Sequence, residues 1–412
     1  MALLSASLVY GGDSGTGNNG SATYKFEPEA RAVLAQAGAE SSRDPKLSID
    51  VTNSVKMLAV YGEAGQQRLG FTSSPDGGDS FAPLMQITQK DARVHSHGEN
   101  SPSVAFGFPY VYALWEQSMP EGGTELVFAR THTRSGAADK PVRVTDKAAP
   151  STNGFSSMAA APNGDIYVVW LDGRRKQAGT FSVYLARSTD KGATFGKNVL
   201  ISDGVCPCCR TTLAFGNKGE VFVTWRHVFE NDFRDMVLAT STDNGATFAA
   251  PVRVAEDGWQ VNICPHTGPT MGVKGNRLYI AWHSEGDGKN PGIRVSWSDD
   301  GGKSFARPVV ISKDVLDTSH PAISVSEDGR VVIVFQGRDR TEKEGWGPVR
   351  PFLVEIDQKG VISPPVLVPG NRKSISYPAV VAGTLGRVVV AWTEAGEKGN
   401  QVMLVRGRRS TH

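Results

Sequence analysis

The chain contains 412 residues, enough for two or three average domains or for one large repeat domain. Its 44 Lys and Arg residues nearly balance its 42 Asp and Glu residues, so the formal net charge of +2 argues against a polyanion-binding surface, and we expect no nucleic-acid partner. No apolar run reaches the roughly 18 residues of a membrane-spanning helix. With 46 Gly, 23 Pro and little helical periodicity, the composition favours many short strands joined by turns.

The N-terminal segment differs in composition from the rest. Met1 to Tyr10 is apolar but lacks a charged n-region, so it fits either the remnant of a signal peptide or an ordinary first strand. The polar stretch Gly11 to Ala22 has the composition of a flexible leader, and Pro28 to Gly38 predicts a short helix. We therefore expect a leader, a short helix and a closing strand within residues 1–45, one repeat domain over residues 46–412, and a secreted or periplasmic protein.

An apolar strand that ends in an aromatic residue recurs along the chain. The aromatic positions are Tyr61, Trp115, Trp170, Trp225, Trp282, Phe335 and Trp392. The intervals between them are 53 to 57 residues, which leaves room for about four strands in each repeat. This period is typical of a β-propeller. The sequence predicts an all-β fold with seven blades of four antiparallel strands, or six blades if the first or the last copy is partial.

A second motif, Ser-x-Asp-x-Gly-x-x-Phe, marks four of the repeats. Its copies begin at Ser74, Ser188, Ser241 and Ser298. The Asp side chain can accept backbone N–H bonds, the Gly can adopt a positive φ, and the Phe can pack back into the blade. The motif therefore predicts a tight turn between two strands.

This pattern resembles the Asp box, or bacterial neuraminidase repeat, of the sialidase-like propellers. The resemblance covers residues 46–412. It implies a propeller in which each box joins the third and fourth strands of a blade, remote from the active face. We interpret the boxes as structural, because many propellers without hydrolytic activity carry them.

The last repeat stops after its third strand, Gln401 to Gly407. A propeller that ends this way leaves an unpaired sheet edge unless another segment covers it. We expect an N-terminal strand, either Ser5 to Tyr10 or Ala22 to Phe26, to supply the missing outer strand and to close the ring.

The strand order sorts the unusual residues onto one face of the ring. In a four-stranded blade, the segment before the first strand and the segment after the second share a face, and the Asp-box turn lies on the other. All 4 cysteines and six of the 8 histidines fall on the first face. They are Cys206, Cys208, Cys209, Cys264, His95, His97, His227, His266, His283 and His320. This sorting indicates that the face is functional.

Three interpretations of the cysteines remain open. They can form disulfides, with Cys206 pairing Cys264 across adjacent blades. They can bind a metal, because thiolate and imidazole ligands suit copper or zinc. The candidate ligands are Cys206, Cys208, Cys209, Cys264, His266 and His320. In the third interpretation Cys209 is a reactive thiol whose pKa is lowered by Arg210.

The resemblance also implies a catalytic alternative. Sialidases bind the substrate carboxylate with three arginines and use a tyrosine nucleophile with a glutamate, in place of the usual pair of carboxylates. The candidates on the same face are Arg210, Arg174, Arg338, Tyr377 and Glu285. The chain departs from that pattern because it has no Arg-Ile-Pro or Arg-x-Pro element before the first Asp box, and because its Cys/His cluster is foreign to a sialidase site.

The leading hypothesis is an exported sialidase-like propeller that acts as a binding protein. Its ligand on the channel face would be a small molecule, a carbohydrate or a metal ion, copper or zinc in the last case, and a protein partner is a further candidate. The alternatives are a glycoside hydrolase or lyase acting on an anionic sugar, and a disulfide-stabilised interaction scaffold.

Overall fold

The structure of the protein, a computed structural model, describes residues 24–34, 42–49, 52–62, 67–89, 92–136, 138–146, 151–177, 179–286, 288–340, 347–370, 373–396 and 399–410. In these ranges the chain forms 30 short strands, with two 3-10 turns, η2 (Glu230–Asp232) and η3 (Thr384–Gly386), and no α-helix. None of the described residues belongs to a helix long and apolar enough to cross a membrane. The all-β prediction is therefore confirmed.

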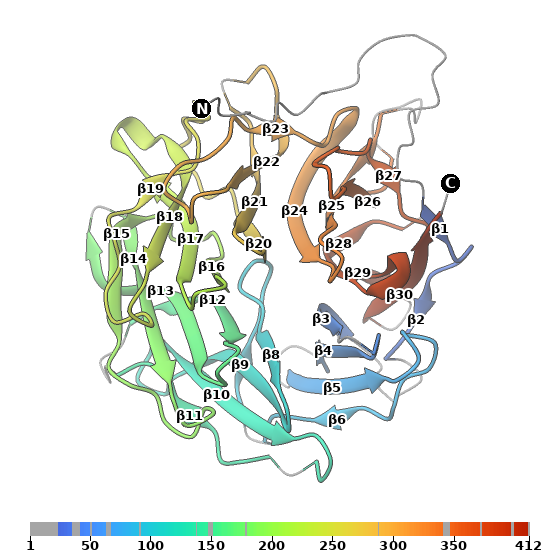
Figure 1. Ribbon diagram of the computed structural model, residues 1–412. Coiled ribbons are helices and arrows are strands. Elements are labelled where there is room, and N and C mark those ends of the chain that lie inside the picture. Colours follow the sequence, from blue (N-terminus) through green and yellow to red (C-terminus); the bar gives the residue numbers. More distant parts are fainter. Residues whose placement is uncertain are drawn as a thin grey trace.

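The strands form six antiparallel sheets that follow the chain order (Figure 1). The first contains β3 (Ser42–Ile49), β4 (Val55–Tyr61), β5 (Arg68–Ser74) and β6 (Met85–Gln86). The second contains β7 (Val94–His95), β8 (Ser103–Gly107), β9 (Tyr110–Ser118), β10 (Thr124–His132) and β11 (Val142–Arg143). The third contains β12 (Asn153–Ala160), β13 (Ile166–Gln177), β14 (Thr180–Ser188), β15 (Val199–Val205), β16 (Thr212–Phe215), β17 (Val221–Val228), β18 (Arg234–Ser241) and β19 (Val252–Arg253).

The remaining three sheets complete the chain. The fourth contains β20 (Thr270–Lys274), β21 (Arg277–Ser284), β22 (Gly292–Ser298) and β23 (Val309–Val310). The fifth contains β24 (Val315–Val325), β25 (Val331–Asp339), β26 (Arg350–Ile356) and β27 (Val366–Leu367). The sixth contains β28 (Ile375–Ala382), β29 (Arg387–Gly396), β30 (Gly399–Arg409), β1 (Tyr24–Phe26) and β2 (Arg31–Ala32).

The sheets stand around a common centre, consistent with a β-propeller (Figure 1). The first strands of successive repeats contact one another in the order β3, β8, β12, β16, β20, β24 and β28, and β28 contacts β3. The eight-stranded sheet consists of two four-stranded parts that are linked by a single pairing, Val205 with His227. Because these first strands contact one another in a circle, they line the middle of the molecule.

The repeated aromatic residues form the core between neighbouring sheets. Trp170 is fully buried in one cluster with Leu114 and Phe128 of the preceding sheet. Trp225 is fully buried with Val183 and Leu185 of the preceding repeat. Burying aromatic and aliphatic area between adjacent sheets is what stabilises a ring of repeats, each of which is too small to fold alone.

The N-terminal strand lies at the edge of the last sheet. β1 pairs with β30, from Tyr24 opposite Arg409 to Phe26 opposite Gly407. Of the two strands predicted for this role, Ala22 to Phe26 contains β1, whereas Ser5 to Tyr10 lies outside the described residues. The helix predicted over Pro28 to Gly38 is wrong in its described part, because β2 pairs with β30 there and Leu34 enters the core.

The Asp boxes form the predicted turns after the third strand of their repeats. Ser241 ends β18, and its hydroxyl donates to Asp243 while accepting the Gly245 N–H. Asp243 also accepts the backbone N–H and the hydroxyl of Thr247 at 2.9 and 2.6 Å. These hydrogen bonds, first that of the Thr247 hydroxyl, lower the pKa of Asp243 to about 2.

We expect the stabilising effect of the Asp243 carboxylate to disappear in acid. Its pKa in the folded state lies below the unfolded value of about 3.9, so the contribution is present above pH 4 and is lost as the pH falls through about 2. Thermal unfolding of the wild-type protein and of Asp243→Asn between pH 6 and pH 2 tests this. The wild type should be the more stable at pH 6, and the difference should shrink below pH 4. A difference independent of pH would contradict the assignment.

Candidate functional site

The cysteine-rich loop joins the two halves of the third sheet. It runs from the end of β15 at Val205 to the start of β16 at Thr212. The Cys206 N–H donates to the Arg226 carbonyl at 3.0 Å, and the Thr211 N–H donates to the Phe155 carbonyl at 3.2 Å. Both ends of the loop are thereby held against first and second strands of the repeats, which leaves little freedom to the three cysteines between them.

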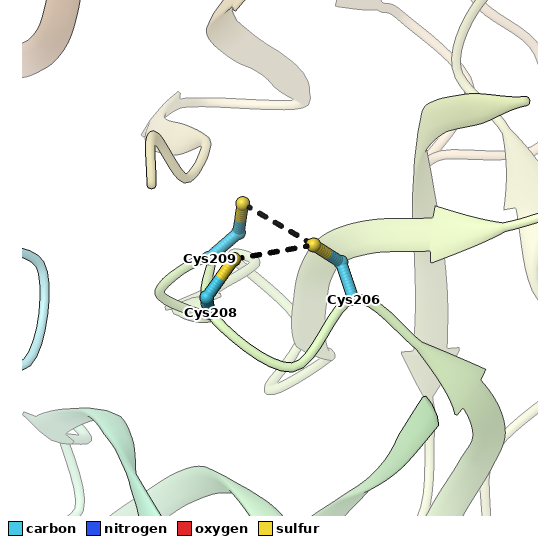
Figure 2. A group of neighbouring side chains, drawn as sticks. All are labelled: Cys206, Cys208 and Cys209. Carbon is cyan, nitrogen blue, oxygen red and sulfur yellow. Dashed lines mark hydrogen bonds between the residues drawn. The ribbon is translucent and has the colours of Figure 1, made fainter. Parts of the chain in front are cut away.

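Three thiols of this loop converge in a buried cluster (Figure 2). The Sγ atom of Cys206 lies 3.7 Å from that of Cys208 and 3.5 Å from that of Cys209. All three side chains are buried, with at most 4% of their surface exposed. Two sulfur ligands at 2.3 Å from a tetrahedral ion lie about 3.8 Å apart, so this spacing, which is also van der Waals contact between sulfur atoms, would accommodate a metal.

A second set of donors shares one of these thiols. Cys208, Cys264 and His266 place their ligand atoms within 4.8 Å of one another, as do Cys206, Cys208 and Cys209. Cys264 and His266 precede β20 and are exposed. The structure therefore brings together five of the six predicted metal ligands.

The sixth predicted ligand, His320, belongs to neither set. It lies in β24, where its Nδ1 atom is 2.8 Å from the Ser319 hydroxyl and its Nε2 atom is 3.4 Å from a Glu99 carboxylate oxygen. Its ring also packs edge-on against Tyr377, with centroids 4.5 Å apart. Among the described residues, His320 therefore belongs to a polar group with Glu99 and Tyr377 and not to the thiol cluster.

All four cysteines are free thiols in this structure. A disulfide requires a sulfur–sulfur distance of about 2.05 Å, far shorter than the separations that Cys206 makes with Cys208 and Cys209. The predicted Cys206–Cys264 disulfide is not formed in this structure, although the two thiols interact.

Two guanidinium groups lie beside the thiols. Arg234, at the start of β18, donates from Nη1 to the Cys206 sulfur at 3.2 Å. Arg226, in β17, has no exposed surface and donates to the carbonyls of Arg234, Thr267 and His283. Its Nε atom has no hydrogen-bond partner, and none of the ion pairs among the described residues involves Arg226. Arg234 in contrast lies 3.9 Å from the Asp232 carboxylate.

This environment changes the pKa of Cys206 most strongly. Hydrogen bonds from Cys208, Cys209 and Cys264, together with the charge of Arg226, hold the pKa of Cys206 far below its usual range. Burial raises the pKa of Cys209 to about 12. A buried cation is stabilised by an anion at short range. Among the residues that the structure describes, the thiol cluster is the only group next to Arg226 that can carry a negative charge.

The thiol cluster and the Asp boxes lie at opposite ends of the same strand. Arg234 opens β18 and contacts Cys206, whereas Ser241 closes β18 and begins the Asp box. Eight residues of strand span roughly 23 Å at about 3.3 Å per residue. The predicted separation of the cysteines from the Asp boxes is confirmed.

A polar group surrounds the same end of the first strands. Irregular register occurs in β3, β12, β24 and β28, and each strand there contains a non-glycine residue with a positive φ just before or at the start of its regular pairing, β24 having a second one in Asp317. These residues are Asp44, Phe155, His320 and Tyr377, with φ of 54°, 52°, 52° and 51°. Left-handed backbone costs a non-glycine residue on the order of 1–3 kcal/mol and concentrates at functional sites, which marks this ring of positions as a candidate site.

Lys46 and Tyr377 belong to this polar group. Burial lowers the pKa of Lys46 to about 7, with Arg210 acting in the same direction. Burial raises the pKa of Tyr377 to about 12, and the charges of Glu99 and Asp44 add to the effect. A tyrosine nucleophile requires the opposite shift, because the phenolate is the reactive form.

Arg210 lies in the same region but is occupied by the protein itself. It donates from Nε to the Glu99 carbonyl, from Nη1 to Ser103 and Ser156, and from Nη2 to the carbonyl and hydroxyl of Ser101. All five of its N–H donors are thereby used. Arg210 ties three first strands together in the centre of the ring.

The other predicted catalytic residues are dispersed. Arg174 forms ion pairs with Asp172 and Asp146 and stacks over Tyr184. Arg338, near the end of β25, pairs with Asp317 and donates to the Gly347 carbonyl. Glu285 is exposed after β21. Arg174 and Arg338 thus have separate partners and do not form a common carboxylate-binding fork with Arg210.

Sequence reasoning did not identify Glu99, Asp44, Lys46, Arg226 or Arg234 as parts of the site. Two signals were available. The dipeptides Asp44-Pro45, His320-Pro321 and Tyr377-Pro378 occupy the same place in their repeats. Arg226 directly follows the aromatic residue of a strand that is otherwise apolar, and a charged residue in such a run indicates a buried partner.

Comparisons with known proteins agree with this architecture. The sequence profile of the BNR repeat-like domain matches residues 110–390. A protein of unknown function from Dyadobacter fermentans superimposes with a TM-score of 0.51 at 14% identity, covering 77% of this chain and 98% of that one. A mutant of Trypanosoma rangeli sialidase that displays trans-sialidase activity also gives a TM-score of 0.51 at 14% identity, covering 89% of this chain and 54% of that one. No curated protein matches in sequence.

Proposed function

The chain belongs to the BNR repeat-like family of the sialidase-like superfamily. We propose that this member of the family is a binding protein for a thiophilic metal ion, copper or zinc. The observation that carries the proposal is the convergence of four thiols and one imidazole in two overlapping sets of ligands. Thiolate and imidazole donors select copper(I) and zinc over hard cations. The ligand on the channel face is then the metal itself.

The surroundings of the cluster support metal-bound thiolates over neutral thiols. Arg226 is fully buried without a carboxylate in the described part of the chain, and Arg234 contacts the Cys206 sulfur directly. Replacing neutral thiols by metal-bound thiolates supplies negative charge where two cations are buried. Second-shell hydrogen bonds of this kind orient ligands and tune the metal.

The catalytic alternative has less support. A hydrolase that binds a substrate carboxylate needs free arginine donors, and Arg210 has none left in this structure. The pKa of Tyr377 is shifted away from that of an activated nucleophile. The irregular strands with Asp44, His320 and Tyr377 instead form a polar surround next to the metal ligands.

We further propose that the ring has seven blades and that β1 completes the seventh. The circular order of contacts among the seven first strands and the pairing of β1 with β30 support this count. Residues 46–412 would then form the propeller, with part of the N-terminal segment built into its last blade. We also propose that the protein is exported. In an oxidising compartment, a bound metal would prevent the neighbouring thiols from forming disulfides.

Elemental analysis of the protein purified without oxygen or reductant tests the function. We expect copper or zinc at one ion per chain or more, together with four thiols that react fully only after a chelator and a denaturant are added. The double variant Cys206→Ser, Cys209→Ser should lose the inner set of ligands and the metal that this set holds. Protein that contains no metal above background and fewer than four thiols would support the disulfide-stabilised scaffold instead.

A further inference from the structure

We propose that the thiol cluster holds two copper(I) ions bridged by the Cys208 thiolate. This inference rests on the proposed metal-binding function and specifies the number and oxidation state of the ions. Cys206, Cys208 and Cys209 would bind the inner ion, and Cys208, Cys264 and His266 would bind the outer one.

The grouping of the ligand atoms is the first argument. The five donors do not form one group: two sets of three fall within 4.8 Å, and Cys208 is the member that they share. Two ligand atoms of one ion with metal–sulfur bonds of about 2.3 Å can lie at most about 4.6 Å apart. A single ion therefore cannot be bound by all five donors as they are placed, whereas two ions with a common thiolate can.

The coordination number and burial of the inner set favour copper(I). Zinc in structural sites takes four ligands, and a zinc ion with three protein ligands completes its shell with water. Cys206 and Cys209 have no exposed surface and Cys208 has 4%, which disfavours a water ligand there. Copper(I) is a soft ion that accepts three thiolates without a fourth ligand.

The charge balance gives an independent argument. Four thiolates with two monovalent ions carry a formal charge of minus two. The guanidinium groups of Arg226 and Arg234, both buried, lie next to these thiols and offset that charge. Two zinc ions would leave the four thiolates neutral and the fully buried Arg226 without an anion, which is costly in the interior, whereas Arg234 also lies 3.9 Å from the Asp232 carboxylate.

The two sites differ in access to solvent. Cys264 and His266 are exposed, and the adjacent Ile263 is 67% exposed, whereas the inner thiols are buried. The outer set is thus the entry site, and Cys208, which belongs to both sets, connects it with the inner set. A bridging thiolate allows transfer between the two sets, because Cys208 can bind an ion in the inner set while it still binds an ion in the outer set.

Titration of the reduced full-length protein with copper(I), against a chromogenic copper(I) chelator and without oxygen, measures the stoichiometry. We expect two ions per chain for the wild type, one for Cys264→Ser and one for Cys209→Ser, because each variant leaves one complete set. Cys208→Ser removes a ligand from both sets and should retain less than one ion under the same competition. X-ray absorption should show a copper–copper vector in the wild type that is absent in Cys264→Ser.

The outcomes separate this inference from the proposed function. One ion per wild-type chain, unchanged in Cys264→Ser, would overturn the two-ion cluster and leave a three-thiolate metal site in place. No uptake by the reduced wild type would overturn both. Because Cys208 is buried and its replacement can disturb folding, the exposed Cys264 provides the decisive variant, and circular dichroism of each variant identifies any loss of fold. His132→Asn, at the end of β10, is the matched histidine control and should bind two ions.

Discussion

Loading with copper(I) is expected to raise the thermal unfolding midpoint of the reduced wild-type protein, and Cys206→Ser is expected to remove the part of that increase that the inner ion contributes. An ion that binds only the folded state stabilises it by about 4 kcal/mol when its free concentration is about 1,000 times the dissociation constant. The three inner ligands belong to one loop, whose ends are held by the Arg226 and Phe155 carbonyls. The bound ion therefore stabilises a segment that joins two halves of one sheet.

Cys206 is the sharpest position for this test because it contacts Cys208, Cys209 and Arg234. Serine is close in volume but buries a hydroxyl, so the metal-free variant should unfold within about 1–3 kcal/mol of the metal-free wild type. Differential scanning calorimetry with and without copper(I) gives both comparisons. His132→Asn should keep the full increase. An equal increase in the wild type and in Cys206→Ser would show that the ion binds elsewhere.

The architecture was accessible from the sequence because it repeats. Trp170, Trp225 and their equivalents fill the same place between neighbouring sheets, so the period of the aromatic residues is also the period of the fold. The Asp box is a local structure: Ser241, Asp243 and Thr247 satisfy one another within seven residues. Local hydrogen bonding and a repeated core both leave a direct trace in the order of residues.

The candidate site was only partly accessible because its members come from different repeats. Strand order was sufficient to place Cys208 and Cys264 at the same end of the ring, and the structure brings them together. Strand order does not give side-chain directions, which is why His320 was grouped with the thiols although it contacts Glu99. Arg210 shows the same limit, since its occupation by main-chain carbonyls depends on irregular strands that no spacing encodes.

The N-terminal segment shows how tertiary contacts override local preference. Its alanines favour a helix, yet β2 pairs with β30 and Leu34 is buried in the core. An unpaired sheet edge exposes a row of backbone donors and acceptors, and pairing satisfies them. The gain from covering that edge, together with burial of apolar side chains, exceeds the modest helix propensity of the segment.

Tyr24 anchors this strand, and deletion of residues 24–34 is expected to cause the largest loss of stability of any change outside the thiol cluster. Tyr24 is buried in a core cluster with Val332, Leu353 and Val405, and its hydroxyl donates to the buried Glu355 carboxylate. Removing a buried aromatic ring costs about 3–5 kcal/mol, and the deletion also exposes the edge of β30.

A pair of point variants separates the two contributions of Tyr24. Tyr24→Ala should lose about 3–5 kcal/mol. Tyr24→Phe keeps the ring but leaves Glu355 without its hydroxyl donor, so it should lose about 1–3 kcal/mol. Lys25→Ala, on the exposed side of the same strand, should change the free energy of unfolding by less than about 0.5 kcal/mol. Urea denaturation of the wild type, the three point variants and the deletion variant measures these values. Wild-type stability in the deletion variant would mean that β1 contributes nothing to the last sheet. Because β1 and β30 are joined by backbone pairing as well as by Tyr24, the deletion should exceed Tyr24→Ala, and the excess measures the covering of the sheet edge.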